Sequence, residues 1–258
     1  MLFVIDVGNS NTVMGLYDGN TLTNKWRMTT DHDKTADEFG LYFMACFSHA
    51  KIEVEQVEAV VIASVVPPIM YSLEHACRKY IEKNPIIVGP ELETGIKILV
   101  DNPHEVGADR IVNAVAACEI YKGALILVDF GTATTFDAIS PNKEYLGGVI
   151  CPGVKISADA LFNKASKLPR VELVRPEKSI GTNTVKSIQS GLLFGYVGQV
   201  EYIVKMMKSE MEFDTITVVA TGGLARMFAN ETVLIDFIDS TLTLEGLRII
   251  YERNNNKK

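Results

Sequence analysis

A short pattern that occurs twice constrains the fold of this chain more than any other feature. Residues 2–13 read LFVIDVGNSNTV, and residues 125–136, which lie 123 positions later, read LILVDFGTATTF. Each copy is an apolar strand, then Asp-x-Gly, small polar residues, a Thr and further apolar residues. Gly lets the backbone approach a ligand closely, and exposed backbone N–H groups bind anions. The pattern therefore predicts two hairpins whose tips hold phosphate or metal.

A second correspondence indicates that the chain is duplicated. Residues 61–64 (VIAS) resemble residues 218–221 (VVAT), and both read as buried strands that end in small polar residues. A repeat of this size predicts two related half-domains, which we expect at residues 1–108 and 109–258. The spacing of the repeats places about 34 extra residues in the second half, at about 147–190.

Hydrophobic periodicity predicts a β-β-β-α-β-α order in each half, and so a mixed sheet flanked by helices in an α/β protein. In the first half we expect strands at 2–7, 12–17, 22–28, 57–66 and 85–88, and helices at 35–50 and 69–83. In the second half we expect strands at 124–130, 134–139, 145–150 and 216–220, and helices at 109–121, 155–164, 184–207, 224–230 and 244–254.

Composition excludes several classes of function. The net charge of −7 argues against nucleic-acid binding. The longest apolar runs are too short to span a membrane, and the chain starts without a signal-peptide pattern, so we expect a cytoplasmic protein. The cysteines and histidines lack metal-ligand spacing. Cys151 is near the expected site, but no partner His for a catalytic thiol is evident.

A third segment, Thr-Gly-Gly at residues 221–223, ends a predicted strand and leads into a helix. Alone it is typical of a simple turn, but after two Asp-x-Gly loops it is a candidate wall for adenosine. The order of the three segments resembles the superfamily of acetate kinases, sugar kinases, heat-shock chaperone ATPases and actin. The resemblance implies two duplicated ribonuclease-H-like (actin-like) domains with the nucleotide cleft between them.

The most distinctive stretch, NPHEVGADRIVNA at residues 102–114, narrows this resemblance. Together with the two hairpins, and with IGTNT at 180–184 followed by Ser-Gly at 190–191, it resembles the type III pantothenate kinases. One departure concerns Val100, since many members of that family have an aromatic residue near this position that contacts the substrate.

Asp109 and Arg110 open a predicted helix, and each has two interpretations. Asp109 can cap free N–H groups, or it can accept the proton of an alcohol that attacks the γ-phosphorus. Arg110 can form a surface salt bridge, or its planar guanidinium can bind a carboxylate. Pantothenate carries both a primary hydroxyl and a carboxylate, so the pair suits this substrate.

The family resemblance implies a role for each motif. Asp109 would be the catalytic base, and the pantothenate pocket would be lined by Gly107, Ala108, Asp109, Arg110 and Thr184. ATP would be bound by Asp6, Val7, Gly8, Asn9, Ser10, Asn11, Thr12, Val13, Gly131, Thr132, Gly222 and Gly223. The metal sites would be Asp129, for K⁺ or NH₄⁺, and Asp6, which would orient Mg²⁺ through water. The residues alone leave open which Asp takes which ion.

The resemblance also implies a homodimer in which the partner chain helps to build the pantothenate pocket. The predicted helix after Gly191 carries apolar residues that could form such an interface or an internal core, namely Leu192, Leu193, Tyr196 and Val200.

The leading hypothesis is ATP-dependent phosphorylation of the primary hydroxyl of pantothenate, the first step of coenzyme A biosynthesis. Three alternatives remain: another small-molecule kinase or phosphatase of the superfamily, a non-catalytic regulatory protein, and a filament-forming relative of actin. The intact Asp6, Asp109, Asp129 and Thr132 argue against a degenerate regulator, and the lack of large insertions argues against an actin relative.

Overall fold

The computed structural model describes residues 1–255, which form two compact units. Unit 1 comprises Met1–Ile96, Asp101–Ala116 and Thr241–Lys258, the last of these described as far as Asn255. Unit 2 comprises Lys97–Val100 and Ala117–Ser240. The expected division after residue 108 differs from this one, because the last helix returns to unit 1 and the short segment Lys97–Val100 joins unit 2.

The sheet of unit 1 has the strand order β3-β2-β1-β4-β5. Its strands are β1 (Leu2–Val7), β2 (Asn11–Asp18), β3 (Thr21–Thr29), β4 (Ala59–Ser64) and β5 (Ile86–Ile87). The first three strands pair antiparallel, whereas β4 lies parallel to β1. Strands β1 and β4 are continuously apolar because helices cover both faces of the sheet.

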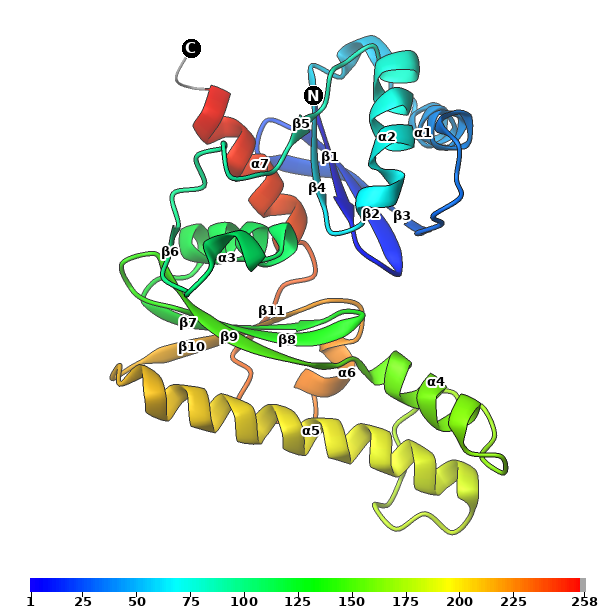
Figure 1. Ribbon diagram of the computed structural model, residues 1–258, viewed down its shortest axis with the longest axis vertical. Helices are drawn as coiled ribbons and strands as arrows, with labels where there is room; N and C mark the ends of the chain where they lie inside the picture. The colour runs from blue at the N-terminus through cyan, green and yellow to red at the C-terminus, as the bar shows by residue number, and fades with distance from the viewer. Residues whose placement is uncertain (256–258) are drawn as a thin grey trace. The chain divides into compact units, whose positions relative to one another are not determined.

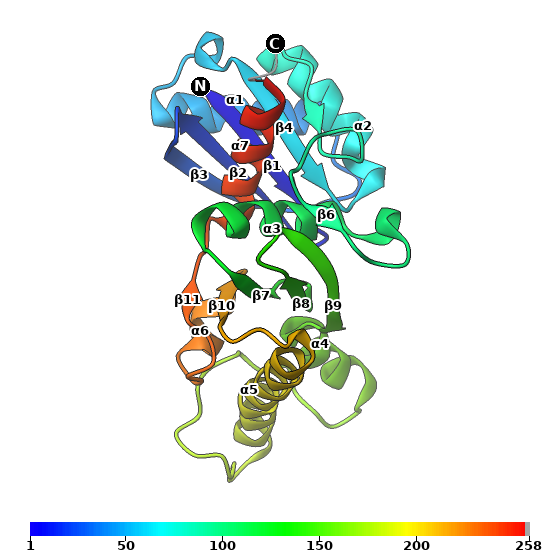
Figure 2. The ribbon, with the colours of Figure 1, turned by 90° about the vertical axis from the view of Figure 1, so that its left-hand side faces the viewer.

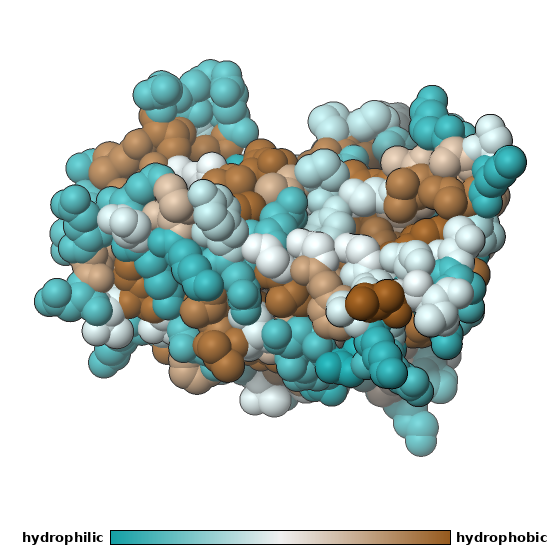
Figure 3. Space-filling model, turned by 90° about the horizontal axis from the view of Figure 1, so that it is seen from below, coloured by the Kyte–Doolittle hydropathy of each residue, from teal (hydrophilic) through white to brown (hydrophobic). Residues whose placement is uncertain are grey.

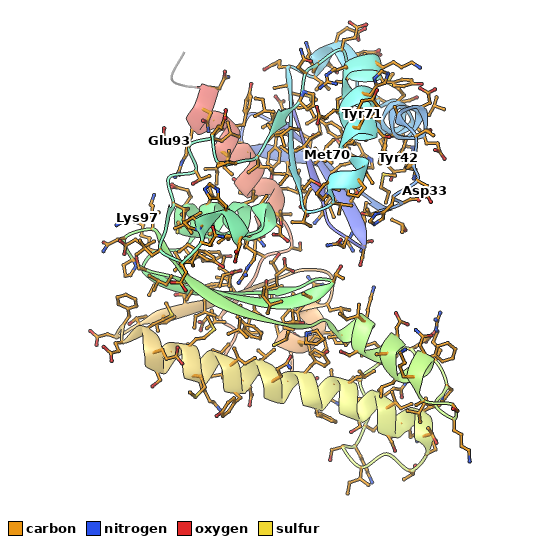
Figure 4. The ribbon with its side chains drawn as sticks, in the orientation of Figure 1. Asp33, Tyr42, Met70, Tyr71, Glu93 and Lys97 are labelled. Atoms are coloured by element: carbon orange, nitrogen blue, oxygen red, sulfur yellow. The ribbon has the colours of Figure 1, made fainter. Side chains whose placement is uncertain are left out.

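One face of this sheet packs on α1 (Ala36–Ala50) and α2 (Pro67–Ala76), which continues as a π-helical turn, η2 (Cys77–Ile81). Phe3 of β1 meets Phe43 and Phe47 of α1 edge to face, with ring centroids 5.4 and 5.1 Å apart. Figure 4 shows Tyr42, Met70 and Tyr71 on α1 and α2. Short 3₁₀ turns, η1 (Val54–Gln56) and η3 (Pro103–Glu105), complete this part of the chain.

The other face of the unit 1 sheet is covered by the last helix, α7 (Leu242–Asn255), as Figure 2 shows. A Cβ added to Gly15 of β2 would lie 3.0 Å from Leu244, so the helix packs closely on the strand. At its other end, the side chain of Asn254 makes two 3.0 Å hydrogen bonds with the backbone of Glu93, which Figure 4 labels. These contacts explain why the end of the chain belongs to the unit that its beginning forms.

The sheet of unit 2 repeats the arrangement of unit 1. Its strands are β6 (Lys97–Ile98), β7 (Ala124–Phe130), β8 (Ala133–Ile139), β9 (Glu144–Pro152), β10 (Ile216–Thr221) and β11 (Phe237–Ile238). In the order β11-β10-β7-β8-β9-β6, strand β7 pairs antiparallel with β8 and parallel with β10, as β1 does with β2 and β4. The predicted duplication into two mixed sheets is therefore confirmed, and β6 is an added edge strand.

The remaining helices are α3 (Ala108–Ile120), which starts in unit 1 and ends in unit 2, and α4 (Val154–Lys164), α5 (Thr184–Met211) and α6 (Ala225–Ala229) of unit 2. Figure 1 shows α5 lying along one face of the second sheet. Leu192, Leu193 and Val200 are buried in that core, so this apolar row of α5 packs inside unit 2. Among residues 1–255, no helix is both long and apolar enough to cross a membrane.

Candidate active site

The first hairpin connects β1 to β2 through a tight loop, residues 8–11, which we call the first loop. The N–H of Gly8 donates to the carbonyl of Asn11 at 3.1 Å and closes the turn. Asp6 lies at the end of β1, paired with Val13, and Thr12 is completely buried on the strand that follows. The structure therefore brings all the expected first-loop residues, Asp6, Val7, Gly8, Asn9, Ser10, Asn11, Thr12 and Val13, into one hairpin.

A residue that the sequence motifs do not include, Thr30, supports this loop. It follows directly after β3, and only 9% of its surface is exposed. Its hydroxyl donates to the carbonyl of Gly8 at 2.6 Å and lies 3.0 Å from the hydroxyl of Thr12. Its backbone N–H donates to the carbonyl of Ser10 at 3.1 Å. No local pattern could identify Thr30, because its partners lie about twenty residues away in the sequence.

Val65 links the first loop to the start of α3 within unit 1. Its N–H donates to the carbonyl of Val7 at 3.1 Å. A Cβ added to Gly107 would lie 3.6 Å from its side chain and 2.6 Å from Oδ1 of Asp109. Val65 therefore contacts both the residue before the first loop and the segment that carries Asp109.

Asp109 lies in the first turn of α3 and is half-buried. Its Oδ1 accepts the backbone N–H of the next residue, Arg110, at 2.8 Å. Burial raises the pKa of this carboxyl, and the Arg110 N–H and charge oppose the rise only in part. An Asp with a raised pKa that is only half-buried is suited to accept a proton from an alcohol.

The second hairpin connects β7 to β8 through residues 131–132, which we call the second loop. Asp129 lies at the end of β7, between two glycines of neighbouring segments. A Cβ on Gly131 would lie 3.5 Å from Oδ1 of Asp129, and one on Gly222 would lie 2.5 Å from the same oxygen. Gly222 has a φ of +92°, which side-chain-bearing residues rarely adopt. The Thr-Gly-Gly segment and Asp129 thus meet, as β10 pairs Thr221 with Asp129.

The second loop also rests on a glycine that the sequence motifs do not include. A Cβ on Gly153 would lie 2.0 Å from the carbonyl oxygen of Thr132, so the chain before α4 touches the loop backbone. The Pro-Gly pair at residues 152–153 indicates a turn, but not what it contacts. Nearby, burial raises the pKa of the Cys151 thiol, which favours its protonated form.

The other expected site residues divide between the two units. Gly107, Ala108 and Arg110 belong to unit 1 with Asp109, whereas Thr184 belongs to unit 2 with Asp129, Thr132 and Gly223. Thr184 is exposed in the first turn of α5, which Asn183 caps by accepting the N–H of Lys186 at 2.9 Å.

The carboxylates near the two loops determine which kind of cation the protein can hold. Within residues 1–255, no group of three or more His, Cys, Asp or Glu side chains could enclose a metal ion. A cation that accompanies nucleotide phosphates needs only one or two carboxylates, since phosphates and water supply its other ligands. Asp6 and Asp129 each end a strand and are each partly exposed, so their hard oxygen donors fit such an ion.

Solved structures with the same fold include nucleotide-binding proteins. One, described as a Baf family transcriptional activator from Campylobacter jejuni, is 20% identical, with a TM-score of 0.62 over 98% of this chain and 99% of the other. A protein described as a 2-dehydro-3-deoxygalactonokinase from Sinorhizobium meliloti is 10% identical, with a TM-score of 0.59 over 98% and 96%. The activator of 2-hydroxyisocaproyl-CoA dehydratase from Clostridium difficile, solved with bound ADPNP, is 11% identical, with a TM-score of 0.53 over 99% and 94%.

The sequence assigns the chain to a narrower class of proteins than the fold does. A sequence model of the type III pantothenate kinases matches residues 2–206. The match spans both hairpins, the segment that carries Asp109 and the start of α5. The chain therefore belongs to the type III pantothenate kinase family, whose members phosphorylate pantothenate with ATP in the biosynthesis of coenzyme A.

Proposed function

We propose that Asp109 is the general base of pantothenate phosphorylation in this chain. The observation that carries the proposal is the state of its carboxylate, which is half-buried at the start of α3, has a raised pKa and is held at Oδ1 by the backbone N–H of Arg110. Oδ2 accepts the proton of the primary hydroxyl as the hydroxyl oxygen bonds to the γ-phosphorus. The bond between that phosphorus and the β,γ-bridging oxygen breaks, and ADP leaves with the bonding electrons.

ATP is held by its phosphates at both loops in this proposal. The first loop offers the backbone N–H groups of residues 8–11, and the second loop offers the hydroxyl and N–H of Thr132. Gly222 and Gly223 form a wall for adenosine, because their lack of side chains allows a flat ligand to approach the backbone.

Asp6 and Asp129 hold the cations that accompany ATP. We assign Mg²⁺ to Asp6, through water, and K⁺ or NH₄⁺ to Asp129. When bound, these ions neutralise the negative charge that gathers on the phosphates. The position of Asp129 supports this role, because its carboxylate lies against both Gly131 of the second loop and Gly222 of the Thr-Gly-Gly segment.

Pantothenate is held by Gly107, Ala108, Asp109, Arg110 and Thr184. The guanidinium of Arg110 pairs with the carboxylate of pantothenate, since its planar donors match two carboxylate oxygens. Asp109 then receives the hydroxyl at the other end of the same substrate.

The test is ADP release by the purified protein with ATP and Mg²⁺, with and without pantothenate, and with K⁺ replaced by Na⁺. We expect turnover that requires pantothenate and is several-fold faster in K⁺. ADP release that ignores pantothenate would overturn the substrate assignment, and equal rates in K⁺ and Na⁺ would overturn the monovalent site.

We also propose that the chain acts as a homodimer in the cytoplasm. The row Leu192, Leu193 and Val200 is unavailable for this purpose, because it is buried inside unit 2. Support comes from other apolar residues of α5, since Tyr202 is 67% and Met206 45% exposed. Figure 3, which looks onto the molecule from below, shows apolar side chains scattered among hydrophilic ones. Light scattering coupled to size exclusion should give twice the 28.4 kDa chain mass, and a monomer would contradict the proposal.

A further inference from the structure

The first loop is held by a relay of two threonine hydroxyl groups. The Thr30 hydroxyl uses its single proton to donate to the carbonyl of Gly8 at 2.6 Å. The hydroxyl of Thr12, 3.0 Å away, must therefore be the donor in its bond with Thr30. Thr12 is fully buried and Thr30 nearly so, and their relay ends on a loop carbonyl. Hydrogen bonds in such a chain strengthen one another in the low-dielectric interior.

Thr30 also fixes a second carbonyl of the same loop. Its backbone N–H donates to the Ser10 carbonyl at 3.1 Å, while the Gly8 N–H is occupied by the Asn11 carbonyl at 3.1 Å. The C=O and N–H of a trans peptide point in opposite directions. With the carbonyls of Gly8 and Ser10 directed at Thr30, the N–H groups of Asn9 and Asn11 point away from it.

This arrangement matters because the first loop is otherwise easy to rearrange. Gly8 has no side chain to restrict rotation of the Gly8–Asn9 peptide. If that peptide turned over, a carbonyl oxygen would replace an N–H on the anion-binding side of the loop and would repel phosphate. One hydrogen bond from a side chain outside the loop prevents this rotation.

We infer that Thr30 is a positioning residue for nucleotide binding, which orients the peptides of the first loop so that their N–H groups face the ATP phosphates. The inference rests on the proposal that this loop binds ATP. Thr30 itself does not touch the nucleotide, since its hydroxyl and N–H are both directed at loop carbonyls.

Three variants separate this role from ordinary stabilisation. Thr30→Val keeps the shape of the side chain and removes the hydroxyl, and Thr30→Ser keeps the hydroxyl. Thr23→Val is the matched control, because Thr23 lies on β3 and its hydroxyl donates to a β2 carbonyl, that of Leu16, at 3.0 Å. It removes the same kind of bond, from a threonine hydroxyl to a backbone carbonyl, at a position away from the loop.

For Thr30→Val we expect the KM for ATP, and the Kd for a non-hydrolysable ATP analogue, to rise about tenfold, with the KM for pantothenate changed less than twofold. A tenfold change corresponds to about 1.4 kcal/mol. Thr30→Ser should restore wild-type nucleotide binding, and Thr23→Val should lower Tm without changing the Kd. A Kd for Thr30→Val within twofold of wild type would overturn the inference.

A fourth variant covers the case in which Thr30→Val does not fold. Thr12→Val removes the outer hydroxyl of the relay and leaves the Thr30–Gly8 bond, so we expect a smaller rise in the Kd of the analogue, of about threefold. An unchanged Kd would count against the relay. If the wild-type protein binds no ATP analogue, the proposed ATP site itself fails, and that result is distinct from a normal Kd in the variants.

Discussion

Gly107 faces Asp109 so closely that a methyl group on Gly107 would lie 2.6 Å from Oδ1 of the carboxylate. Such a contact is too short, so one of the two residues would have to move. The Gly107 carbonyl also accepts the N–H groups of Arg110 and Ile111 at 3.1 and 3.2 Å, which anchors its backbone to α3. The carboxylate is therefore the part that would be displaced.

Gly107→Ala should lower kcat about tenfold or more, because a base displaced by about 1 Å loses much of its effect. The fold should persist, since the substitution adds one methyl group at a partly exposed position. Steady-state kinetics and a thermal melt test this together. A variant with normal kcat would show that the position of the carboxylate is not critical.

Asp109→Asn should reduce kcat by at least about a hundredfold, since removal of a general base costs 10²–10⁴ in rate. Burial disfavours the ionised carboxylate, so the neutral amide should leave Tm at pH 8 equal to or above that of the wild type. ADP release and calorimetry on the same preparation provide the measurement. Near-normal turnover would rule out Asp109 as the base.

The raised pKa of Asp109 predicts the pH dependence of the reaction. The base must be deprotonated, so kcat/KM should fall as the pH drops through a pKa above the ordinary value of about 3.9. The folded state binds this proton more tightly than the unfolded state. Its contribution to stability is therefore present at low pH and is lost as the pH rises through the folded-state pKa. A kcat/KM profile that stays flat down to pH 4 would contradict the assignment.

Gly222→Ala should impair activity through Asp129. The new Cβ would lie 2.5 Å from Oδ1 of Asp129, at a backbone φ of +92°. Gly19→Ala is the matched control, because Gly19 also has a positive φ, +54°, but nothing lies within 4 Å of its Cβ position. Gly19→Ala should lose about 1–2 kcal/mol of stability, and Gly222→Ala should lose more, because its Cβ would also lie 2.7 Å from backbone atoms of Phe130. Only Gly222→Ala should weaken the activation of turnover by K⁺. If K⁺ activates both variants equally, Gly222 does not influence the cation site.

The sequence predicted the features that depend on local pattern. The Asp-x-Gly loops, the main strands and the start of α3 to within one residue, Ala108 instead of Asp109, follow from apolar runs, glycines and polar residues over short distances. The two-residue strands β6 and β11 are too short to show a hydrophobic period, so the sequence does not predict them.

Features that depend on distant partners could not be read from the sequence. Thr30 resembles any other threonine at a strand end, and its importance comes from a loop about twenty residues away. The apolar row Leu192, Leu193 and Val200 indicated a buried face of α5, but not whether a sheet or a second chain covers it. The sequence also does not show which of the two sheets α7 packs on, because the hydrophobic periodicity of this helix fits either unit.

The return of α7 has a consequence for the order in which a nascent chain can fold. A ribosome releases the strands β1–β5 first, but the helix that covers their second face is made last. Until then, Val4 and its neighbours on that face lack their cover. Residues Ala117–Ser240, in contrast, emerge as a nearly complete unit and can fold while synthesis continues. The half that is made first is thus the half that is finished last, and chains that terminate early should expose an uncovered sheet to chaperones and proteases.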